Sequence, residues 1–338
     1  MKKIPYSTQN IDQNDIKNVI KVLKSPNLTQ GPQIKKFEDM ISKYVGCKYA
    51  VAVTSCTAGL HLSMLAVNFT KKDELITSSI SFVSSPNSSQ FIGGSVKFTD
   101  IENNNLGMCL NDLKKKISKK TKVIMPVHMG GLAKNAKEIK NIAQSKKIIV
   151  IEDAAHSLGA KYVNTKYKVG SCKFSDMTVF SLHPVKSITT GEGGVVTTNN
   201  KQLYERLLRL RSHGINKNKD KFVYHNQAYK NKKRNKWYYE MQELGFHYRI
   251  TDIQCALGIS QLKKLNKFIK KRREISLKYD EFFKKIKIIK PTQLGFRKFS
   301  SNHLYIVRFK KISKIKNRQH FFNYLQDRNI ICQIHYIP

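Results

Sequence analysis

The sequence predicts an α/β fold with a mainly parallel sheet, because short apolar runs alternate with helix-like or loop segments in the first part of the chain. These runs cover residues 49–53, 74–82, 95–100, 122–128 and 147–153. Beyond residue 251 the alternation is sparser. We therefore expect a large α/β domain over 1–250 and a smaller α+β domain over 251–338, with function where the parallel strands end.

The first elements follow from apolar spacing and from residues that break helices. Residues 11–25 have apolar side chains at helical spacing, and a stretch with two prolines and a glycine ends the pattern. An amphipathic helix is expected over 34–46, closed by Gly46. The strand 49–53 runs directly into a helical pattern over 54–67, so a strand-to-helix junction is expected there.

The second half begins with a strand and a helix over 201–214, followed by a polar, lysine-rich stretch over 215–237. We expect this stretch to be a mobile surface loop, with a nucleic-acid-binding arm as the alternative. Residues 251–286 predict one or two long amphipathic helices. A strand over 303–309, a further helix, and a strand with a turn over 330–338 complete the chain, and a C-terminal segment is expected to be missing.

The chain is strongly basic, with a formal net charge of +39. Such a charge is typical of proteins that bind nucleic acid or an anionic membrane. Of the 62 basic residues, however, 11 are arginine and 51 are lysine, and the lysines are spread along the chain among asparagine and isoleucine. Because nucleic-acid recognition favours arginine, we interpret the charge as a diffuse background that can attract an anionic substrate.

The cysteine pattern and the N-terminus indicate the cellular setting. The six cysteines form no CxxC pair and no cluster with histidine, so neither a zinc site nor a disulfide framework is indicated. The first ten residues lack an apolar signal core, and no apolar run approaches the length of about 20 residues that spans a bilayer. These features predict a cytoplasmic protein without a metal.

Residues 54–60 read TSCTAGL and lie at the strand-to-helix junction, where free backbone N–H groups and the helix dipole favour an anion. This stretch is a candidate phosphate cradle, and an ordinary helix cap by Thr54 or Ser55 is the alternative. Asp153 ends the apolar strand 147–153. Its carboxylate can either cap a helix or hold a proton on the ring nitrogen of a cofactor.

Two further stretches supply an aromatic ring and an amine. Phe82 is either part of the core or a ring that stacks on a planar cofactor. Residues 180–194 read FSLHPVKSITTGEGG and offer the hydroxyl of Ser181 and the amine of Lys186, close to glycines that permit close backbone approach. A phosphate cradle, a carboxylate, a stacking ring and a lysine amine together predict pyridoxal 5'-phosphate as the cofactor.

In combination these motifs resemble the DegT/DnrJ/EryC1/StrS family, whose members are aminotransferases of nucleotide-linked keto sugars. The resemblance covers nearly the whole chain and rests on IPYS, LTQGP, TSCTAGL, EDAAHSLGA, FSLHPVKSITTGEGG, RSHG, ELGFHYRITDIQCALG, SSNHLY and QIHY. It implies the fold of the fold-type I pyridoxal-phosphate transferases, which is similar to that of aspartate aminotransferase. HPVKSITTGEGG, SSNHLY and QIHYIP are most similar to transaminases of pseudaminic acid biosynthesis.

The resemblance implies roles for individual residues. Lys186 would be the Schiff-base lysine and proton shuttle, and Asp153 would be the partner of the pyridinium. Phe82 would be the stacking ring, and His156 would lie near the phenolic oxygen of the cofactor. The phosphate would be bound by Thr57, Ala58, Ser181 and His247.

His247 stands where family members have an asparagine that comes from the neighbouring subunit, so the resemblance implies a homodimer with shared active sites. The positions that match the family's sugar-nucleotide site are Tyr6, Asn27, Leu28, Thr29, Gln30, Cys56, Gln333, Ile334, His335 and Tyr336.

The resemblance also implies the reaction. Relatives that act as dehydratases have histidine at the position of Lys186, so the lysine favours a transaminase. Glutamate would give its amino group through pyridoxamine phosphate to the C4 ketone of a UDP-linked 4-keto-6-deoxy-N-acetylhexosamine. The alternatives are the same chemistry on another nucleotide-linked keto sugar, or a non-catalytic cofactor-binding or nucleic-acid-binding protein.

Overall fold

The computed structural model describes residues 3–286, 288–309 and 317–337, and its centre is a seven-stranded sheet. Strand β7 is antiparallel to both of its neighbours, whereas the remaining pairs in the sheet are parallel. The predicted mainly parallel α/β sheet is therefore confirmed. In order across the sheet the strands are β1 (Tyr49–Val53), β7 (Gly194–Thr198), β6 (Met177–Ser181), β5 (Ile149–Asp153), β4 (Thr121–Met125), β2 (Glu74–Ser78) and β3 (Ser95–Thr99).

Side chains of the strands alternate between two buried layers, as the pleat of a strand requires. In β1, Ala52 belongs to one layer and the next residue, Val53, belongs to the other. The sheet is thus covered on both faces, which is the usual arrangement for parallel strands. The helices of the first layer are α2 (Pro32–Val45) and α9 (Asp252–Phe283), and those of the second are α3 (Cys56–Ala66) and α7 (Lys201–Leu210).

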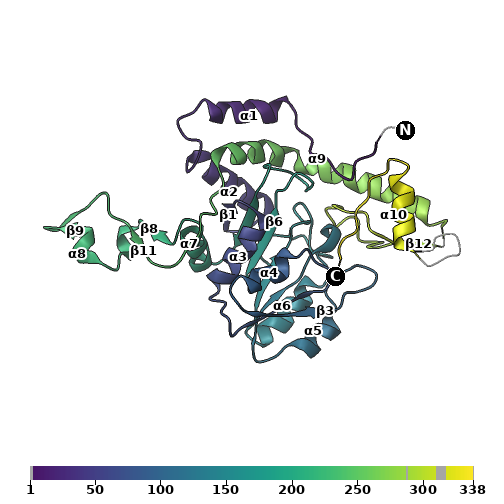
Figure 1. Ribbon diagram of the computed structural model, residues 1–338, viewed down its shortest axis with the longest axis horizontal. Helices are drawn as coiled ribbons and strands as arrows, with labels where there is room; N and C mark the ends of the chain where they lie inside the picture. The colour runs from purple at the N-terminus through teal and green to yellow at the C-terminus, as the bar shows by residue number, and fades with distance from the viewer. Residues whose placement is uncertain (1–2, 287, 310–316, 338) are drawn as a thin grey trace.

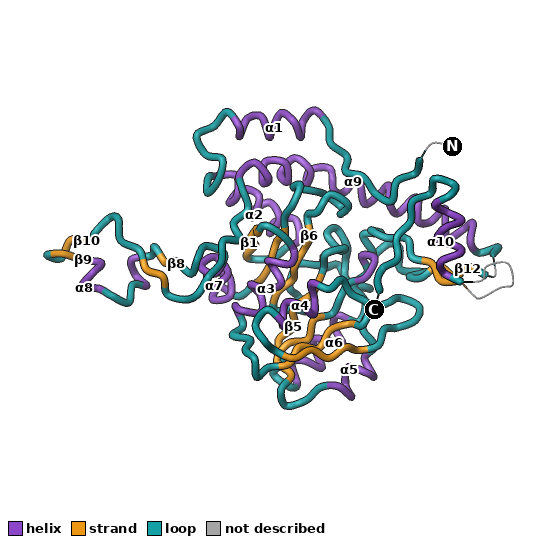
Figure 2. Tube along the Cα trace, in the orientation of Figure 1, coloured by secondary structure: helices purple, strands orange, loops and turns teal. Residues whose placement is uncertain are grey.

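The other helices of this region surround the sheet (Figures 1 and 2). Helix α1 (Gln13–Leu23) packs along α9, and α4 (Ser84–Gln90) contacts α3. Helix α5 (Leu110–Lys116) lies against β3, and α6 (Ala136–Ser145) lies against β5. A short 3-10 turn, η1 (Met129–Gly131), follows β4.

Residues 215–246 form an arm that projects from the body beyond α7 (Figure 1). The stretch predicted as a loop contains short paired strands instead. The Glu240 carboxylate accepts the backbone N–H groups of Val223 and Tyr224, and these bonds hold the arm together. Trp237 is 74% exposed on this arm. The arm's elements are β8 (Ile215–Asn216), η2 (Lys219–Lys221), α8 (His225–Ala228), β9 (Tyr229–Lys230), β10 (Lys233–Arg234) and β11 (Glu240–Met241).

The C-terminal part begins with α9, which is one continuous helix of 32 residues. The strand predicted over 303–309 begins only at Val307, because the backbone of Ser301 and His303 bonds to the Gly130–Gly131 turn instead. In the described part of 330–338 no strand forms, and a single bridge joins Ile330 to Ile4; residue 338 lies outside the described residues. The remaining elements are β12 (Ile289–Pro291), β13 (Val307–Phe309) and α10 (Arg318–Gln326).

Helix α9 packs with both parts of the chain. Ile259 and Leu265 belong to the core beneath the large sheet, whereas Asp280 near the other end binds Arg297. The predicted domain boundary at residue 250 stays a prediction. Of the helices in the described ranges, none has the length and apolar character to cross a membrane.

The start of α2 depends on a carboxylate from α9. Its N-cap residue, Gly31, has no side chain to bond the first turn. The fully buried Asp252 accepts the N–H groups of Gly31 at 2.7 Å and Gln33 at 2.8 Å. A negative charge at the N-terminus of a helix is also stabilising, because the helix dipole is positive at that end. Asp252 thus joins α9, α2 and the loop before α2.

We expect Asp252→Ala to lower the free energy of unfolding by about 2–3 kcal/mol, because it leaves two buried N–H groups without an acceptor. The control is Asn200→Ala, which removes an exposed cap from α7 and is expected to cost about 1 kcal/mol. Urea denaturation of both variants measures the difference. Equal losses would show that burial of Asp252 adds nothing to its capping role.

Candidate active site

The carboxyl ends of the parallel strands carry the predicted catalytic side chains. Asp153 is the last residue of β5, and Ser181 is the last residue of β6. Lys186 lies in the loop that joins β6 to β7 at the same edge of the sheet. Helix α3 begins just after β1 ends, also at this edge. Ligands of open α/β sheets bind at such an edge.

Backbone hydrogen bonds hold the loop that carries Lys186. The N–H of Leu182 donates to the carbonyl of Gly193 at 2.9 Å and closes the base of the loop. The N–H of Lys186 donates to the carbonyl of His183 at 2.9 Å, so Lys186 ends a tight turn. The lysine is therefore presented from a fixed backbone.

The environment of the Lys186 amine favours its neutral form. The side chain is half-buried, and burial lowers its pKa, while the neighbouring Cys56 and Asp153 act in the opposite direction. An amine with a lowered pKa is more often neutral at pH 7, and the neutral amine is the nucleophile. Burial also raises the pKa of the Cys56 thiol well above its ordinary value.

The carboxylate of Asp153 is 3% exposed and has a donor on each oxygen. The Ser85 hydroxyl donates to Oδ2 at 2.5 Å, and the Ala155 N–H donates to Oδ1 at 3.0 Å. The described chain passes from β5 to β6 without an intervening helix, so Asp153 caps a turn and not a helix. Its buried charge is thus available to a cofactor nitrogen.

The predicted phosphate cradle lies at the first turn of α3. The Ser55 hydroxyl accepts the N–H of Ala58 at 3.0 Å, so Ser55 is also the helix cap that the sequence offered as an alternative. A Cβ at Gly194 would lie 2.5 Å from the carbonyl oxygen of Ser55, so β7 approaches this turn as closely as a backbone can. Ser181 pairs with Gly194, which brings its hydroxyl to the same edge as Thr57 and Ala58.

A cluster of rings from distant parts of the chain lies near Lys186. The N–H of Gly130 donates to Nδ1 of His156 at 3.3 Å, so the neutral ring carries its proton on Nε2, which lies 3.3 Å from the Tyr336 hydroxyl. The Tyr6 hydroxyl lies 2.9 Å from Nε2 of His335. Burial lowers the pKa of His156 well below its ordinary value, and the charges of Lys186 and His335 act in the same direction.

Phe82 is 54% exposed, and its ring centroid lies 5.7 Å from that of Tyr336. It is therefore not part of the core, and its ring is open to a planar partner. Cys56, Tyr6, His335 and Tyr336 are the predicted substrate residues that lie in this cluster, and Ile334 is half-buried beside them in sequence.

The structure places the other predicted residues elsewhere on the surface. Asn27, Leu28, Thr29 and Gln30 are exposed, and Thr29 forms a bridge with Thr251 at the start of α9. Gln333 is exposed as well. His247 is exposed and stacks on His213, with ring centroids 5.3 Å apart. In the part of the chain described, no hydrogen bond or ion pair joins these residues to Lys186.

Sequence reasoning missed Ser85, Arg272 and His303. Ser85 holds Asp153, and Arg272 lines a cavity together with Lys186. His303 is 6% exposed, its ring lies 4.5 Å from that of His156, and neither ring nitrogen has a hydrogen-bond partner among the described residues. The only signal in the sequence was the motif SSNHLY, which contains His303 but does not say what the ring faces.

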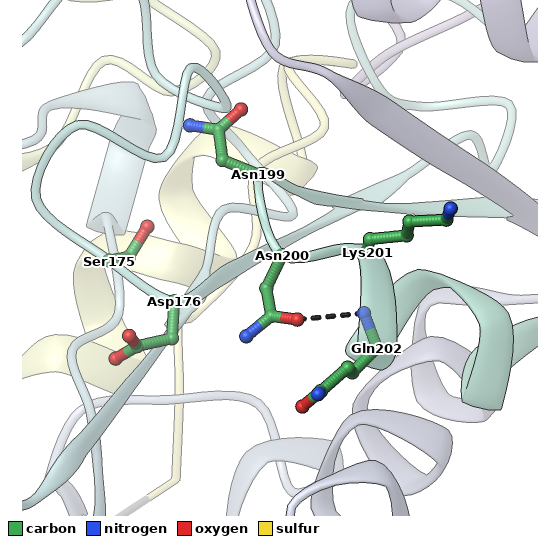
Figure 3. Close-up of a pocket in the computed structure, with 6 residues that line it drawn as sticks. All are labelled: Ser175, Asp176, Asn199, Asn200, Lys201 and Gln202. Atoms are coloured by element: carbon green, nitrogen blue, oxygen red, sulfur yellow. Dashed lines mark hydrogen bonds between the residues drawn. The ribbon is translucent and has the colours of Figure 1, made fainter.

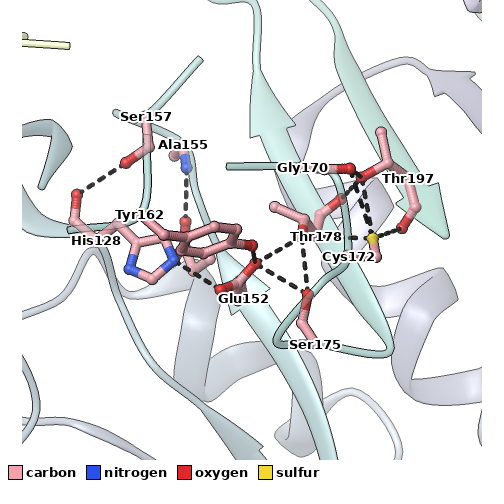
Figure 4. Close-up of polar contacts among 11 residues, drawn as sticks. His128, Glu152, Ala155, Ser157, Tyr162, Gly170, Cys172, Ser175, Thr178 and Thr197 are labelled. Carbon is pink, nitrogen blue, oxygen red and sulfur yellow. Dashed lines mark hydrogen bonds and ion pairs between the residues drawn. The ribbon is translucent and has the colours of Figure 1, made fainter. Parts of the chain in front are cut away.

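A buried polar network surrounds Glu152, the residue before Asp153 (Figure 4). Glu152, the preceding residue, accepts the hydroxyls of Tyr162 at 2.7 Å and Thr178 at 2.6 Å, and lies 3.1 Å from Nε2 of His128. Burial alone would raise the pKa of Glu152, but the charge of His128 and these donors hold it below its ordinary value. The backbone N–H of His128 also donates to the carbonyl of Asp153, so the network fixes the end of β5.

A larger surface cavity of about 580 Å³ lies at the opposite edge of the sheet (Figure 3). Its walls precede β6 and follow β7, far along both strands from the loop of Lys186. Cavity size alone therefore does not mark the site. The lining residues are Ser175, Asp176, Asn199, Asn200, Lys201 and Gln202.

Residues 9–338 match the DegT/DnrJ/EryC1/StrS aminotransferase family. The chain belongs to this family. The UDP-4-amino-4,6-dideoxy-N-acetyl-beta-L-altrosamine transaminase of Campylobacter jejuni is 37% identical over 339 residues, which are 99% of this chain and 84% of that protein.

Solved structures agree with this membership. PseC of Helicobacter pylori, an aminotransferase of pseudoaminic acid biosynthesis, has a TM-score of 0.88 at 33% identity, covering 100% of this chain and 85% of its own. Spr1654 of Streptococcus pneumoniae in its PLP form has a TM-score of 0.88 at 27% identity, covering 99% and 85%. The predicted resemblance and the fold type I of the DegT family are confirmed, and this member is a pyridoxal-phosphate-dependent aminotransferase.

The residues of this DegT-family chain fit the cofactor. Asp153 supplies a buried carboxylate, and the exposed Phe82 supplies a ring face. Gly194 lies against the start of α3, so the N-terminus of this helix is at the same edge of the sheet, and such a terminus favours a phosphate. Lys186 lies next to Asp153 with a lowered pKa. The individual cofactor contacts stay predictions.

Burial lowers the pKa of several histidines in this enzyme, so we expect the free energy of unfolding to fall as pH drops from about 6.5 to 5. The unfolded chain binds protons there that the folded chain does not, so stability rises with pH through this window. The carboxylates with lowered pKa titrate below about pH 4.5 and contribute little. The histidines concerned are His61, His156, His303 and His335.

Urea denaturation of the cofactor-free protein between pH 7.5 and 5 measures this slope. His303→Gln should reduce it, whereas His320→Gln, which changes an exposed histidine on α10, should leave it as it is. A slope that His303→Gln does not alter would contradict burial of a neutral imidazole.

Proposed function

We propose that this enzyme transfers the amino group of glutamate to the C4 ketone of a UDP-linked 4-keto-6-deoxy-N-acetylhexosamine, in the synthesis of a pseudaminic acid-type surface sugar. One observation carries the proposal: the loop of Lys186, the end of β5 at Asp153 and the start of α3 at Cys56 share the carboxyl edge of the sheet. His335 and Tyr336 bring the C-terminal segment to the same place. The names of the C. jejuni and H. pylori relatives support the choice of sugar.

When bound, pyridoxal phosphate supplies an aldehyde carbon and an electron-withdrawing ring, through which an amino group passes from one substrate to the other. Lys186 acts as the base and acid of this transfer. Its neutral Nζ would take the proton from the carbon that bears the donor's amine and place it on the former aldehyde carbon of the cofactor, and with the keto sugar it would move a proton in the reverse direction. The fixed turn at His183 positions the lysine, and burial lowers the pKa of its amine, so the proton that it takes up is more readily given back.

Asp153 holds a proton on the ring nitrogen. Its two oxygens accept from Ser85 and Ala155, so the side chain keeps one orientation. A carboxylate that is held charged in a buried place favours the protonated form of a nitrogen next to it. His156 presents its Nε2–H, since its Nδ1 accepts from Gly130. That proton is a donor for an oxygen on the cofactor or the sugar.

The proposal includes a homodimer. His247 is exposed and directly follows the arm in sequence, so it is accessible to a second copy of the chain. We propose that it donates an imidazole N–H to the phosphate in the other copy, while Thr57, Ala58 and Ser181 bind the phosphate from its own chain. Asn27 to Gln30 and Gln333 to Tyr336 then line the sugar-nucleotide site.

The choice of substrate is tested by incubating the enzyme with glutamate and a panel of UDP-linked 4-keto sugars. We expect the 4-keto-6-deoxy-N-acetylhexosamine to be aminated at C4, as identified by mass and NMR of the product. Amination of a different nucleotide-linked keto sugar, with no reaction of this one, would replace the proposed substrate. A chain that binds no cofactor would reject the proposal entirely.

Lys186→Ala should abolish amino transfer and leave noncovalent binding of the cofactor. The measurement is intact mass after borohydride reduction: the native protein should gain the mass of the cofactor, and the variant should not. Lys270→Ala removes an exposed lysine from α9 and is the control. If Lys186→Ala still gained the mass, another lysine would be the attachment site.

Asp153→Asn should lower turnover at least about 100-fold, because the amide keeps the shape but cannot hold the ring proton by its charge. The free energy of unfolding should change by only about 1 kcal/mol, because an amide oxygen still accepts from Ser85 or Ala155. Asp176→Asn is the matched control, since Asp176 pairs with Lys140 at the opposite edge of the sheet. Native turnover in Asp153→Asn would leave it a purely structural role.

A further inference from the structure

Arg272 of α9 is a half-buried cation without an acidic partner. Its one hydrogen bond in the described structure runs from Nη1 to the carbonyl oxygen of His303 at 3.1 Å. Two other arginines of low exposure have carboxylate partners: Arg211 lies 2.6 Å from Glu38, and Arg297 lies 2.9 Å from Asp280. Among the described residues, no carboxylate oxygen stands within ion-pair distance of Arg272.

Arg272 lines a cavity of about 290 Å³ together with Lys186. One wall is the loop of Lys186 and another is α9, and residues 8–10 of the N-terminal segment form a third. Counting only residues that the structure describes, none that lines this cavity carries a carboxylate. The basic residues of its walls are Lys186, Lys271 and Arg272, and of these Lys271 has a carboxylate partner, Glu274 at 3.6 Å, which does not line the cavity.

The charge of Arg272 calls for an anion from outside the chain. Burial lowers its pKa, but a guanidinium still stays protonated at pH 7. The nearby Tyr6 does not supply the anion, because burial raises the pKa of its hydroxyl to about 12. A partly desolvated charge without a partner is unfavourable, and a carboxylate that binds the planar fork of arginine removes that cost.

The ring of His303 adds a second polar group beside Arg272. Its two ring nitrogens have no hydrogen-bond partner in the described structure. Burial lowers the pKa of the ring, and the positive charges of Lys186 and Arg272 lower it further. Because burial keeps the ring neutral, it offers one N–H and one acceptor. A ligand that reaches Lys186 with an amine and Arg272 with an anion would pass close to this ring.

We propose that Arg272 binds a carboxylate of the amino donor, so that the cavity beside Lys186 is the donor's binding place. The inference rests on the proposed transfer from an amino acid to a keto sugar. A volume of about 290 Å³ is at the lower end of ligand pockets and suits an amino acid rather than a nucleotide sugar. Of the residues predicted for the nucleotide sugar, Asn27 to Gln30 are exposed beside the start of α9 and do not line this cavity.

Binding of glutarate, which has two carboxylates and no amine, tests the site without turnover. Calorimetry on the cofactor-free and cofactor-loaded protein should show that Arg272→Gln weakens glutarate binding about 10- to 100-fold, the range expected for a charged hydrogen-bonded pair. Arg272→Lys should lie between the two, because it keeps the charge but loses the fork. Lys270→Gln, an exposed charge removed from the same helix, should bind as the native protein does.

UDP binding and the two half-reactions separate the donor from the nucleotide. In Arg272→Gln the glutamate concentration for half-maximal amino transfer to the cofactor should rise about 10- to 100-fold, with UDP affinity unchanged. Loss of UDP affinity with normal glutarate binding would assign the guanidinium to the diphosphate and overturn the proposal. Unchanged affinity for both ligands in Arg272→Gln and Arg272→Lys would also overturn it.

Melting curves keep the test interpretable. If Arg272→Gln does not fold, Arg272→Lys is compared with the native protein instead. Equal glutarate affinity of these two proteins would contradict binding of a carboxylate by the planar guanidinium. The glutamate half-reaction proceeds whichever sugar is the acceptor. A failure of the proposed sugar is therefore distinguishable from a failure of the donor site.

Discussion

The reversal of β7 is the constraint on which the rest of the site depends. Because β7 runs against β6, Gly194 stands opposite Ser181, and the loop between the two strands stays at the carboxyl edge of the sheet. A parallel strand would instead need a crossover to the other end. The antiparallel pairing of β6 and β7 thus keeps Lys186 at the edge of the sheet where β5 ends in Asp153. Glycine at 194 then lets β7 approach the first turn of α3, so the amine, the carboxylate and the helix end share one edge.

Because of the strand pleat, the buried pair of Glu152 and His128 lies on the face of the sheet opposite to the side chain of Asp153. Successive side chains of β5 point to opposite faces, so Asp153 meets Ser85 while Glu152 turns toward Tyr162 and His128. Removing one partner of such a pair leaves a buried charge, which typically costs about 3–5 kcal/mol. The network therefore fixes the backbone of Asp153 without touching the reacting groups.

The sequence predicts the central sheet and its catalytic edge well, because both follow from local patterns. The strands from β1 to β5 lie within the apolar runs or at most one residue outside them, and Lys186 and Asp153 lie at strand ends as expected. Contacts between distant residues leave no such pattern. Ser85 and Asp153 are 68 residues apart, and nothing in their spacing indicates the bond.

Tertiary pairing also decided where local predictions failed. Residues 303–309 have the apolar character of a strand, but the N–H groups of His303 and Leu304 bond to the carbonyl of Gly130, so a strand begins only at Val307. Residues 215–237 are predicted as a polar loop because the strands of the arm are only two residues long. The Glu240 carboxylate, which holds the arm together, lies outside that stretch, and its bonds form only in the fold.

Burial acts in one direction on the bases around Lys186. It lowers the pKa of Lys186, His156 and His303, so neutral forms are favoured and the local positive charge is smaller than the residue types suggest. Arginine cannot follow them, because its guanidinium stays protonated even when its pKa is lowered. The net charge of +39, spread over the chain, attracts anions at long range. Within the site, the proposed position of a bound anion depends on Arg272, because this guanidinium lacks a carboxylate partner.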